Sequence, residues 1–411
     1  MLIAGKARLV GEIEVSSSKN AILPILASSL LSDENKTILN VPDIRDVTVI
    51  TELIRHLGVK ADYKDGSLHF SGGATGQTPP YELVRLIRAS FLVMGPLLAT
   101  KGAVRVSLPG GCAIGTRPID LHLKGFEALG ARISLTRGDV VAKAPRLYGN
   151  HVYLDFPSVG ATENIMMAAT LAEGTTYIEN AALEPEIVDL ANFMNSMGAR
   201  ITGAGSNVIK IEGVKKLHST VYTPIPDRIE AGTYMVAAAA TAGDVLIKNV
   251  IPEHLKAVTA KLLESNAVVE EQDDHIRVYR QQDIKPVYIK TLPYPGFPTD
   301  MQAQFMAYLS LGRGSSVITE SVFENRFMHV AELLRMGAKI KTEGRTAVIK
   351  GCRELTGARV RATDLRAGAA LMIAGLMARG PTIIMNSEHI DRGYENIVAK
   401  LNGLGANIQP S

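Results

Sequence analysis

The sequence repeats itself six times along its length, and this repeat constrains the fold more than any other feature. Two short motifs recur in step. The copies of the first are LGVKA (57–61), LGARI (129–133), MGARI (197–201), SNAVV (265–269), MGAKI (336–340) and LGANI (404–408). The copies of the second are KTILN (36–40), GAVRV (102–106), GTTYI (174–178), GDVLI (243–247), GSSVI (314–318) and GPTII (380–384). Successive copies of the first motif lie 68 to 72 residues apart, so we expect six structural units of one kind.

Each unit is predicted to contain the same elements in the same order. An alternating stretch such as VYIKTLPY (287–294) predicts a half-buried strand. A helix rich in alanine, leucine and methionine follows, such as NIMMAATLA (164–172), and its composition predicts burial on nearly all sides. A second strand, an amphipathic helix ended by the glycine of the first motif, and a strand hairpin complete the unit. The chain is therefore expected to be an α/β protein of six βαβαββ units.

These six units are expected to divide into two sets of three. Residues 2–15 form a strand segment ahead of the first helix, and we expect this segment to join the last units. The chain would then start and finish in one domain. The proline-bearing stretch TPIPD (223–227) is the candidate crossing point between the domains. A length of 411 residues agrees with two or three domains.

Charge and composition exclude several classes of protein. The 44 basic and 41 acidic residues give a net charge of +3, which is too balanced for a dedicated nucleic-acid-binding protein. Two cysteines cannot form a disulfide framework, and the N-terminal residues lack the long apolar core of a signal peptide. The longest uncharged apolar run, residues 367–378, is shorter than the ~20 residues that a membrane-spanning helix needs. We therefore expect a cytoplasmic protein that binds neither nucleic acid nor membranes.

The stretch LPGGCAIGTRP (108–118) departs from the repeat. The interval from the second motif to the glycine of the first is 28 residues in this unit and 22 to 25 in the others, which indicates an insertion. The stretch contains Cys112 and, five residues later, Arg117. A nearby cation lowers the pKa of a thiol, and glycines allow a loop to close over a ligand, so one interpretation is a reactive thiol in a lid. The other interpretation is a small apolar side chain in a loop.

Charged or small polar residues precede the helices of every unit. Helix N-termini present free N–H groups and a positive dipole, so basic residues there complete sites for phosphates and carboxylates. Before the first helix of successive units stand Lys19 with Asn20, Arg88, residues 158–160, Asp227 with Arg228, Asp300, and Asp364 with Arg366. Before the second helix stand Arg45, Arg117 with Asp120, Glu186, Glu253, Arg326, and Asp391 with Arg392. A structural interpretation stays open for each, and Asp300 and Asp364 in particular are good N-cap residues.

Taken alone, these residues indicate an enzyme that acts on a phosphorylated small molecule. Asp300, a carboxylate without metal-binding neighbours in the sequence, suits a general base. The histidines lack metal-ligand spacing, and no glycine-rich nucleotide-binding loop is present. Cys352, in the stretch IKGCREL (349–355), is interpreted as structural. The residues do not identify the substrate.

The chain resembles the enolpyruvyl transferases that act on UDP-N-acetylglucosamine. The matching segments cover nearly the whole chain in order: SSSKNAILPIL (16–26), RASFLVMGPLLA (88–99), SLPGGCAIGTRPIDLHL (107–123), SVGATENIM (158–166), ENAALEPEIVDLANF (179–193), FPTDMQAQF (297–305), ESVFENRFMHV (320–330), ATDLRAGAAL (362–371) and HIDRGYENI (389–397). The resemblance implies an inside-out α/β fold, with helices buried and sheets outside. It also implies two domains, residues 20–224 with the cysteine loop and residues 1–19 with 225–411, and an active site in the cleft between them.

The resemblance also implies a reaction. The enolpyruvyl group of phosphoenolpyruvate moves to the 3′-hydroxyl of UDP-N-acetylglucosamine and phosphate leaves, which is the first committed step of peptidoglycan synthesis. No cofactor is implied, and the two substrates are the implied partners. Covalent inactivation by the epoxide fosfomycin at Cys112 is a further implication.

Residue roles follow from the matched motifs. Cys112 is implied to be the acid at the methylene carbon of phosphoenolpyruvate, and Asp300 the base at the sugar hydroxyl. Phosphoenolpyruvate is implied to be held by Lys19, Arg117 and Arg392, with Asn20 adjacent and with support from Asp364 and Arg366; Lys19 and Arg392 also belong to the implied catalytic set. The residues implied to contact the UDP-sugar are Arg88, Pro118, Ile119, Asp120, Leu121, Ser158, Val159, Gly160, Asp300 and Val322.

One position departs from the pattern, and two alternatives stay open. Some relatives have a lysine two residues before the serine of SVGAT, whereas this chain has Phe156, which puts a diphosphate contact there in doubt. The first alternative is enolpyruvyl transfer to shikimate 3-phosphate. The second is a paralogue that binds a UDP-sugar without turnover, against which the intact set of Lys19, Cys112, Asp300 and Arg392 argues.

Overall fold

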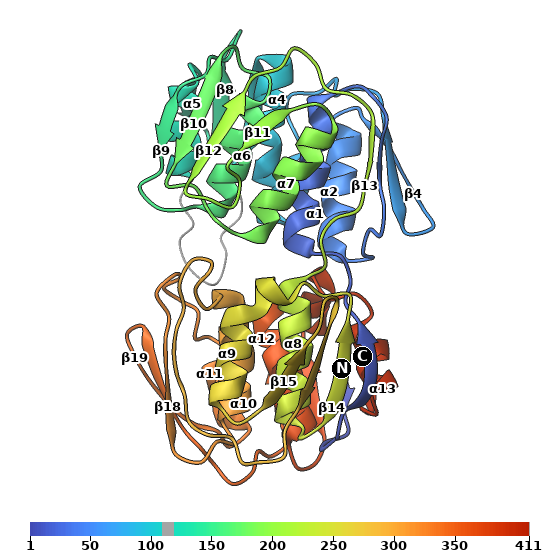
Figure 1. Ribbon diagram of the computed structural model, residues 1–411, viewed down its shortest axis with the longest axis vertical. Coiled ribbons are helices and arrows are strands. Elements are labelled where there is room, and N and C mark those ends of the chain that lie inside the picture. Colours follow the sequence, from blue (N-terminus) through green and yellow to red (C-terminus); the bar gives the residue numbers. More distant parts are fainter. Residues whose placement is uncertain (109–118, 411) are drawn as a thin grey trace. The chain divides into compact units, whose positions relative to one another are not determined.

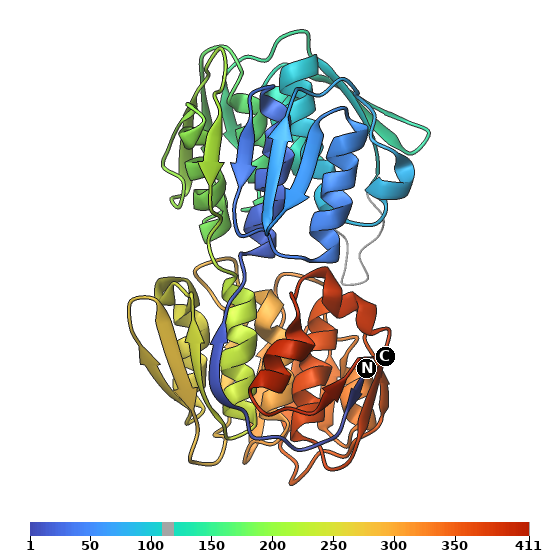
Figure 2. The same cartoon turned by 90° about the vertical axis from the view of Figure 1, so that its right-hand side faces the viewer.

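The structure, a computed structural model, describes residues 1–108 and 119–410, and in these the chain forms two compact units (Figures 1 and 2). The terminal unit, residues 1–16 and 226–410, contains both ends of the chain. The central unit contains residues 17–108 and 119–225. The chain leaves the terminal unit after Ser16 and returns after Ile225, inside the predicted stretch TPIPD. The domain bounds at residues 20 and 224, and an active site in the cleft between the two domains, stay predictions.

Most repeats contribute a sheet of one design: a leading strand lies parallel to a second strand, and an antiparallel hairpin completes the sheet. In the central unit the sheets are, in spatial order, β13 (Thr220–Tyr222), β3 (Lys36–Ile38), β5 (Ser67–Ser71) and β4 (Lys60–Lys64); β6 (Ala103–Ser107), β8 (Asp139–Lys143) and β7 (Arg132–Thr136); and β11 (Arg200–Thr202), β12 (Val208–Glu212), β10 (Thr175–Glu179) and β9 (His151–Tyr153).

The terminal unit has three four-stranded sheets of the same design. They are β15 (Val268–Glu271), β16 (His275–Tyr279), β14 (Asp244–Lys248) and β2 (Val10–Glu14); β17 (Tyr288–Lys290), β18 (Ser315–Thr319), β20 (Thr346–Lys350) and β19 (Lys339–Glu343); and β21 (Arg359–Arg361), β22 (Thr382–Met385), β1 (Leu2–Ile3) and β23 (Ile408–Gln409). Strand β1 supplies a hairpin strand of the last repeat, because it pairs with both β22 and β23.

The two crossings of the chain exchange leading strands between the units. Strand β2 precedes the first helix of the central unit but pairs with β14 of the terminal unit. Strand β13 precedes the first helix after the return but pairs with β3 of the central unit. The expectation that residues 2–15 join the last repeats is confirmed, because β1 joins the sheet of the sixth repeat and β2 that of the fourth. Strand β13, which comes just before the fourth repeat in the chain, pairs with β3 and is not available to β14. Strand β2 therefore supplies the parallel partner that the edge of β14 would otherwise lack.

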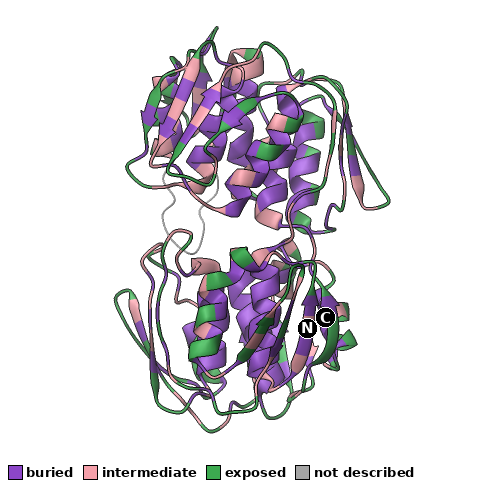
Figure 3. Ribbon diagram, in the orientation of Figure 1, coloured by how far each residue is buried: buried purple, intermediate pink, exposed green. Residues whose placement is uncertain are grey.

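The helices form the interior of each unit, as the inside-out fold requires (Figure 3). The first helices of the repeats are α1 (Lys19–Ser28), α4 (Met94–Lys101, after the 3₁₀ helix η2, Arg88–Val93), α6 (Val159–Ala169), α8 (Arg228–Ala240), α10 (Gln302–Leu309, after η4, Thr299–Met301) and α12 (Leu365–Met377). Every residue of α10 and α12 is buried, and in α8 only Arg228 is not, which confirms the burial predicted from composition. Of the described helices, none combines the length and apolarity needed to cross a bilayer.

The second helices of the repeats each expose one face. They are α2 (Arg45–His56), α5 (Asp120–Ala128), α7 (Pro185–Ser196), α9 (Lys256–Glu264), α11 (Val330–Arg335) and α13 (Ile397–Gly403); the remaining short helices are η1 (Ser29–Leu31), α3 (Tyr81–Val84), η3 (Pro252–Leu255) and η5 (Ser387–Arg392). The glycine of the first repeated motif follows each second helix with a positive φ between 90° and 100° in five repeats, and Asn266 takes the place with φ 72° in the sixth. Left-handed backbone favours glycine and then asparagine, so the motif marks the end of this helix.

The second repeat lacks a leading strand in the part of the chain that the structure describes, contrary to the expected βαβαββ order. The segment before its first helix contains Pro79 and Pro80, which have no N–H to donate to a strand partner. A single bond from the Arg105 N–H to the Gln77 carbonyl, 3.0 Å, stands where the other sheets have a full parallel pairing.

Candidate active site

Three helices of the terminal unit begin with an aspartate or follow one closely. Asp227 is the N-cap of α8, and its Oδ1 accepts hydrogen bonds from the backbone N–H groups of Ile229 and Glu230 at 2.7 and 3.0 Å. Asp364 caps α12 in the same way, through the N–H groups of Arg366 and Ala367 at 2.9 and 3.1 Å. Asp300 lies inside η4 and caps neither η4 nor α10. The N-cap interpretation is therefore confirmed for Asp364 and wrong for Asp300.

The carboxylate of Asp300 is held between two guanidinium groups. Arg326 approaches Oδ1 at 2.6 Å and Arg366 approaches Oδ2 at 3.0 Å. Both arginine side chains are 5% exposed, while that of Asp300 is 26% exposed. Burial by itself would lower the pKa of Arg366, but Asp300, Tyr394 and Asp227 together outweigh it and raise that pKa above its ordinary value. The two nearly buried arginines therefore fix the Asp300 carboxylate, which remains accessible to solvent.

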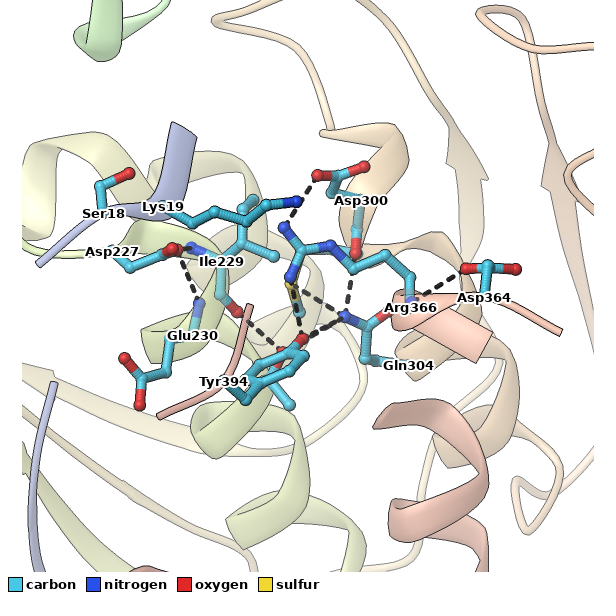
Figure 4. Close-up of polar contacts among 12 residues, drawn as sticks. Ser18, Lys19, Asp227, Ile229, Glu230, Asp300, Gln304, Asp364, Arg366 and Tyr394 are labelled. Atoms are coloured by element: carbon cyan, nitrogen blue, oxygen red, sulfur yellow. Dashed lines mark hydrogen bonds and ion pairs between the residues drawn. The ribbon is translucent and has the colours of Figure 1, made fainter. Parts of the chain in front are cut away.

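Buried polar groups fix Arg366 from below (Figure 4). Its second terminal nitrogen donates to the Tyr394 hydroxyl at 3.1 Å, and that hydroxyl lies 2.9 Å from the Thr233 hydroxyl. The amide of Gln304 donates to Thr233 at 3.2 Å and to the Asp300 carbonyl at 2.9 Å. Burial raises the pKa of Tyr394, so its hydroxyl keeps its proton. Because these groups bond mainly to one another, the orientation of Arg366 is set before any ligand binds.

The loop after β18 is tied to the same place by a buried carboxylate. Glu320 is 1% exposed, and it accepts hydrogen bonds from the backbone N–H groups of Val322 and Phe323 at 2.9 and 3.2 Å. It also accepts from the Thr299 hydroxyl at 2.8 Å, next to Asp300 in the chain. The loop that contains Val322 is therefore anchored to the segment that contains Asp300.

In the central unit, α1 begins at a cation with a buried partner. Ser18 is the N-cap of α1, and its hydroxyl accepts from the Ala21 N–H at 3.3 Å. The ammonium of Lys19 lies 3.0 Å from Asp46 on α2, whose side chain is 3% exposed. Lys19 itself is 14% exposed, so its charge is oriented by Asp46 yet reaches solvent. Asn20 follows, half-buried.

Three further segments of the central unit meet at His122. Its ring lies edge-on to Phe91 of η2, with centroids 5.2 Å apart, and a Cβ at Gly160 would lie 3.4 Å from Nε2. The residues Arg88, Ile119 to Leu121 and Ser158 to Gly160 thus begin elements that pack together. Ser158 caps α6, leaving the first turn of that helix with free N–H groups suited to an anion.

The protonation of His122 follows from its neighbours. The Gly95 N–H donates to Oδ1 of Asn164 at 2.7 Å, which fixes the amide so that Nδ2 donates to Nδ1 of His122 at 3.1 Å. The proton of the neutral ring is therefore on Nε2, the nitrogen nearer Gly160. Burial, with Arg88 adding to it, lowers the pKa of His122 to about 3, so the ring is neutral at physiological pH.

Two buried carboxyl groups of the central unit have no cationic partner among the described residues. Burial raises the pKa of Glu163 well above its ordinary value, and Glu186 and Glu184 add to the effect. Burial raises the pKa of Asp189 to about 6, although the Tyr222 hydroxyl at 2.6 Å and the Ile225 N–H at 3.2 Å partly stabilise its charge. Both carboxyl groups favour the protonated form more than an exposed carboxyl would.

The chain matches known proteins over nearly its whole length. A family model described as EPSP synthase (3-phosphoshikimate 1-carboxyvinyltransferase) matches residues 3–401. A relative from Carboxydothermus hydrogenoformans, UDP-N-acetylglucosamine 1-carboxyvinyltransferase 2, is 60% identical and the match covers 99% of this chain and 98% of the relative. UDP-N-acetylglucosamine 1-carboxyvinyltransferase 1 of Caldanaerobacter subterraneus subsp. tengcongensis is 58% identical over 97% of this chain and 96% of its own. This chain belongs to the enolpyruvyl transferase family.

The fold agrees with that membership. The solved structure of the enolpyruvyl transferase NikO from Streptomyces tendae has a TM-score of 0.89 to this chain at 26% identity, and the match covers 99% of this chain and 98% of NikO. The resemblance stated from the sequence motifs and the inside-out α/β fold that it implied are both confirmed.

The predicted site residues of this enolpyruvyl transferase fall into two described sets. Those in the terminal unit are Asp300, Val322, Asp364, Arg366 and Arg392, and those in the central unit are Lys19, Asn20, Arg88, Ile119, Asp120, Leu121, Ser158, Val159 and Gly160. Cys112, Arg117 and Pro118 lie outside the described residues. Arg392 ends η5 and is half-buried, and Phe156 is 47% exposed. The roles implied for all these residues stay predictions.

Sequence reasoning missed several residues that shape the site of this enolpyruvyl transferase. Arg326 was noted only as a residue before a second helix, although it pairs with Asp300 at 2.6 Å. Glu320, Tyr394 and Gln304 were not singled out, because neither burial nor partners are visible in a one-dimensional pattern. Of the two cysteines, Cys352 is half-buried with its thiol near the Ser310 carbonyl at 3.2 Å, and burial raises its pKa, as the structural interpretation requires.

Proposed function

We propose that this chain transfers the enolpyruvyl group of phosphoenolpyruvate to the 3′-hydroxyl of UDP-N-acetylglucosamine and releases phosphate. The relatives that are 58–60% identical over nearly the whole chain are named for this reaction. The observation in the structure that supports it most is the Asp300 carboxylate, oriented by Arg326 and Arg366 and still 26% exposed. A fixed, accessible carboxylate of this kind is what removal of a hydroxyl proton requires.

The chemistry can be followed atom by atom. Asp300 takes the proton of the 3′-hydroxyl while that oxygen forms a bond to C2 of phosphoenolpyruvate, and Cys112 supplies a proton to the methylene carbon C3. The C2–O bond to phosphate then breaks and C3 loses a proton, which restores the double bond in the product. Positive charge develops at C2 before attack, and a nearby carboxylate stabilises it. Lys19 and Arg392, with Arg117, would hold the phosphate and carboxylate of phosphoenolpyruvate.

The central unit supplies features suited to the UDP-sugar. The first turn of α6 at Ser158 to Gly160, the cation of Arg88 and the neutral His122 together offer donors to a diphosphate. Phosphorylated substrates do not cross membranes unaided, so we also propose that the protein works in the cytoplasm, in peptidoglycan synthesis.

The test is phosphate release from phosphoenolpyruvate with each of two acceptors, UDP-N-acetylglucosamine and shikimate 3-phosphate. We expect phosphate release with UDP-N-acetylglucosamine and not with shikimate 3-phosphate. In Cys112→Ala we expect phosphate release to be lost. Cys352→Ala is the matched control, since its thiol is half-buried and bonded to backbone carbonyls, and it should keep wild-type turnover. Release with shikimate 3-phosphate would establish the alternative acceptor. A folded wild-type protein that binds UDP-N-acetylglucosamine without releasing phosphate would be a binding paralogue.

Fosfomycin provides an independent check on the thiol. We expect covalent inactivation of the wild type and of Cys352→Ala, with an adduct on Cys112 detected by mass spectrometry. A Cys112→Asp variant that stayed fully sensitive would contradict the assignment of the thiol.

A further inference from the structure

Asparagine stands at the end of the second strand, two residues after an isoleucine, in four of the six repeats. These residues are Asn40, Asn180, Asn249 and Asn386, and their φ angles are 51°, 54°, 56° and 56°. Asparagine is the residue other than glycine that adopts this left-handed conformation most readily. The two repeats that depart from the pattern have Leu108, at the start of the cysteine loop, and Glu320. Neither of these two is among the described residues with positive φ.

Two of these asparagines join the second strand to the leading strand. The amide of Asn180 donates to the carbonyl of Leu154, the residue after β9, at 2.7 Å. The amide of Asn249 donates in the same way to the carbonyl of Val15, the residue after β2, at 2.7 Å. This contact belongs to the repeated frame, because it is made at a sheet end in both units.

Glu320 contacts the corresponding residue of its own repeat, but it accepts a hydrogen bond there instead of donating one, and the carbonyl of that residue, Thr291, accepts from the Ser321 hydroxyl. Thr291 is the residue after the leading strand β17, and its hydroxyl donates to Oε1 of Glu320 at 2.7 Å. The backbone path also differs. The Glu320 N–H itself donates to the hairpin carbonyl of Arg345 at 2.8 Å, whereas in the third and fourth repeats the residue after the asparagine, Ala181 or Val250, makes that bond. Glu320 therefore still links the second strand to the residue after the leading strand, while the residues that follow it form a different loop.

The longer side chain reaches two segments that the asparagines do not. Its Oε2 accepts from the hydroxyl of Thr299 at 2.8 Å, and its Oε1 accepts from the N–H groups of Val322 and Phe323 at 2.9 and 3.2 Å. The Phe323 ring in turn lies 5.5 Å from the guanidinium carbon of Arg326, which pairs with Asp300 at 2.6 Å. Four of the other repeats form the same sheet end with an asparagine, so the fold of the repeat does not explain the bonds from Thr299, Val322 and Phe323 to Glu320.

We infer that Glu320 is a positioning residue that sets the placement of Asp300 relative to Val322, and through them the binding and activation of the sugar nucleotide. The inference rests on the proposed function, because Asp300 and Val322 are the residues of this unit proposed to contact UDP-N-acetylglucosamine. A carboxylate with four donors, 1% exposed, leaves both segments little freedom to move. Its effect should thus fall on this substrate more than on phosphoenolpyruvate.

The experiment compares three substitutions of Glu320 in the full chain. In Glu320→Asn the residue of the frame is restored, so the contact to Thr291 can form while the reach to Thr299 is lost. In Glu320→Gln the shape and the acceptor toward the backbone N–H groups are kept. In Glu320→Ala every bond is removed. We expect kcat/KM for UDP-N-acetylglucosamine to fall about 100-fold in the alanine and asparagine variants, as misplacement by about 1 Å allows, and to stay within about threefold in the glutamine variant.

Stability and substrate dependence separate positioning from a purely structural role. The melting temperature of Glu320→Asn should lie above that of Glu320→Ala, while the kinetic loss is similar in both. KM for phosphoenolpyruvate should change less than KM for UDP-N-acetylglucosamine. Asn249→Ala is the matched control, since it removes the frame contact of the fourth repeat at 2.7 Å, and it should lower the melting temperature with kinetic constants unchanged.

The outcomes decide the inference independently of the proposed function. Wild-type constants in folded Glu320→Asn would overturn it, as would kinetic losses no larger than those of Asn249→Ala. Where Glu320→Ala fails to fold, Thr299→Val, which removes the one bond at 2.8 Å, takes its place, and unchanged constants there would also overturn it. If the wild type itself released no phosphate, the proposed reaction would fail. Calorimetric binding of UDP-N-acetylglucosamine, compared between wild type and the same variants, would then decide the role of Glu320.

Discussion

The two units are built on one repeat, but they differ in the partners that surround the carboxyl groups near the starts of their helices. In the terminal unit, the partly exposed Asp300 lies between Arg326 and Arg366, and the buried Glu230 lies 2.7 Å from the Lys400 ammonium. The buried Glu320 of this unit is held instead by hydroxyl and backbone N–H donors. In the central unit, Glu163 and Asp189 have no cationic partner among the described residues, and His122 is neutral. Lys19 with Asp46 is the exception there.

The difference shows that a shared frame does not determine the chemistry of its helix starts. The two guanidinium groups hold the Asp300 carboxylate in one place, which suits a group that must contact the substrate hydroxyl. Free helix N–H groups beside a neutral imidazole suit an anionic ligand, because they can donate hydrogen bonds to it. Each property depends on a few side chains added to the repeated frame, and four substitutions test the contrast between the two units.

Asp300→Asn removes the charge at the centre of the terminal network. We expect kcat to fall by about 10²- to 10⁴-fold, because an amide cannot accept the substrate proton. Steady-state phosphate release measures this. Asp244→Asn is the control, since Asp244 pairs with Arg277 at 2.8 Å in an exposed position, and its kcat should not change. An Asp300→Asn enzyme with a third of wild-type kcat would show that the network does not supply the base.

Asp189 makes the stability of the central unit depend on pH. The pKa of Asp189 is raised from 3.8 to about 6, so between these values the folded chain holds a proton that the unfolded chain has lost. Its contribution to the free energy of unfolding therefore falls as pH rises through this window, by about 3 kcal/mol in total. Urea unfolding of wild type and Asp189→Asn at pH 4 and pH 7 should reveal this difference in slope. Asp155→Asn, an exposed partner of Lys124, should leave the slope unchanged, and parallel curves for Asp189→Asn would contradict the raised pKa.

Asp46→Asn tests Lys19, a cation of the central unit whose carboxylate partner is buried. Without Asp46 the Lys19 ammonium loses its orientation, and we expect KM for phosphoenolpyruvate to rise about tenfold, with a smaller change for UDP-N-acetylglucosamine. Glu82→Gln removes an exposed pair with Arg85 in the same unit and should change neither constant. Equal increases in both KM values would mean that Asp46 supports the unit as a whole.

Tyr394→Phe removes one hydroxyl from beneath Arg366. The free energy of unfolding should fall by about 1–2 kcal/mol, because the hydroxyl bonds with both Arg366 and Thr233. Turnover should stay within about threefold, since the Asp300 carboxylate still holds Arg366 at 3.0 Å. Tyr308→Phe, which removes a buried hydroxyl bonded to Ser265, should cost similar stability with no kinetic change. A tenfold loss of kcat in Tyr394→Phe alone would assign Tyr394 a larger role than orienting Arg366.

Much of the fold could be predicted because the same local sequence preferences recur in the six repeats. Gly58 and its counterparts mark left-handed residues after a helix, and Asn266 fits the same requirement where glycine is absent. The buried first helices follow from their alanine, leucine and methionine content. The missing leading strand of the second repeat could also have been predicted from Pro79 and Pro80, which cannot complete a strand ladder.

The site was predictable only in part. Asp300 and Arg366 were found from residue type, helix position and resemblance, whereas Arg326 was seen without its partner. Glu320 carried a signal that comparison of the repeats could have used, since it stands where four repeats have asparagine. Its burial and its bonds to Thr299 and Val322 were not visible, because they depend on the path of a loop in space.

The number of repeats, the order of helix and strand in most of them, and the positions of left-handed backbone can all be predicted from the amino-acid sequence. These properties depend on each residue and its near neighbours, so a pattern can carry them. Only the tertiary structure decided that β2 and β13 exchange sheets, and that Asp300 meets arginines 26 and 66 residues further along the chain. Such partners are brought together by the packing of buried helices, which depends on the whole core at once.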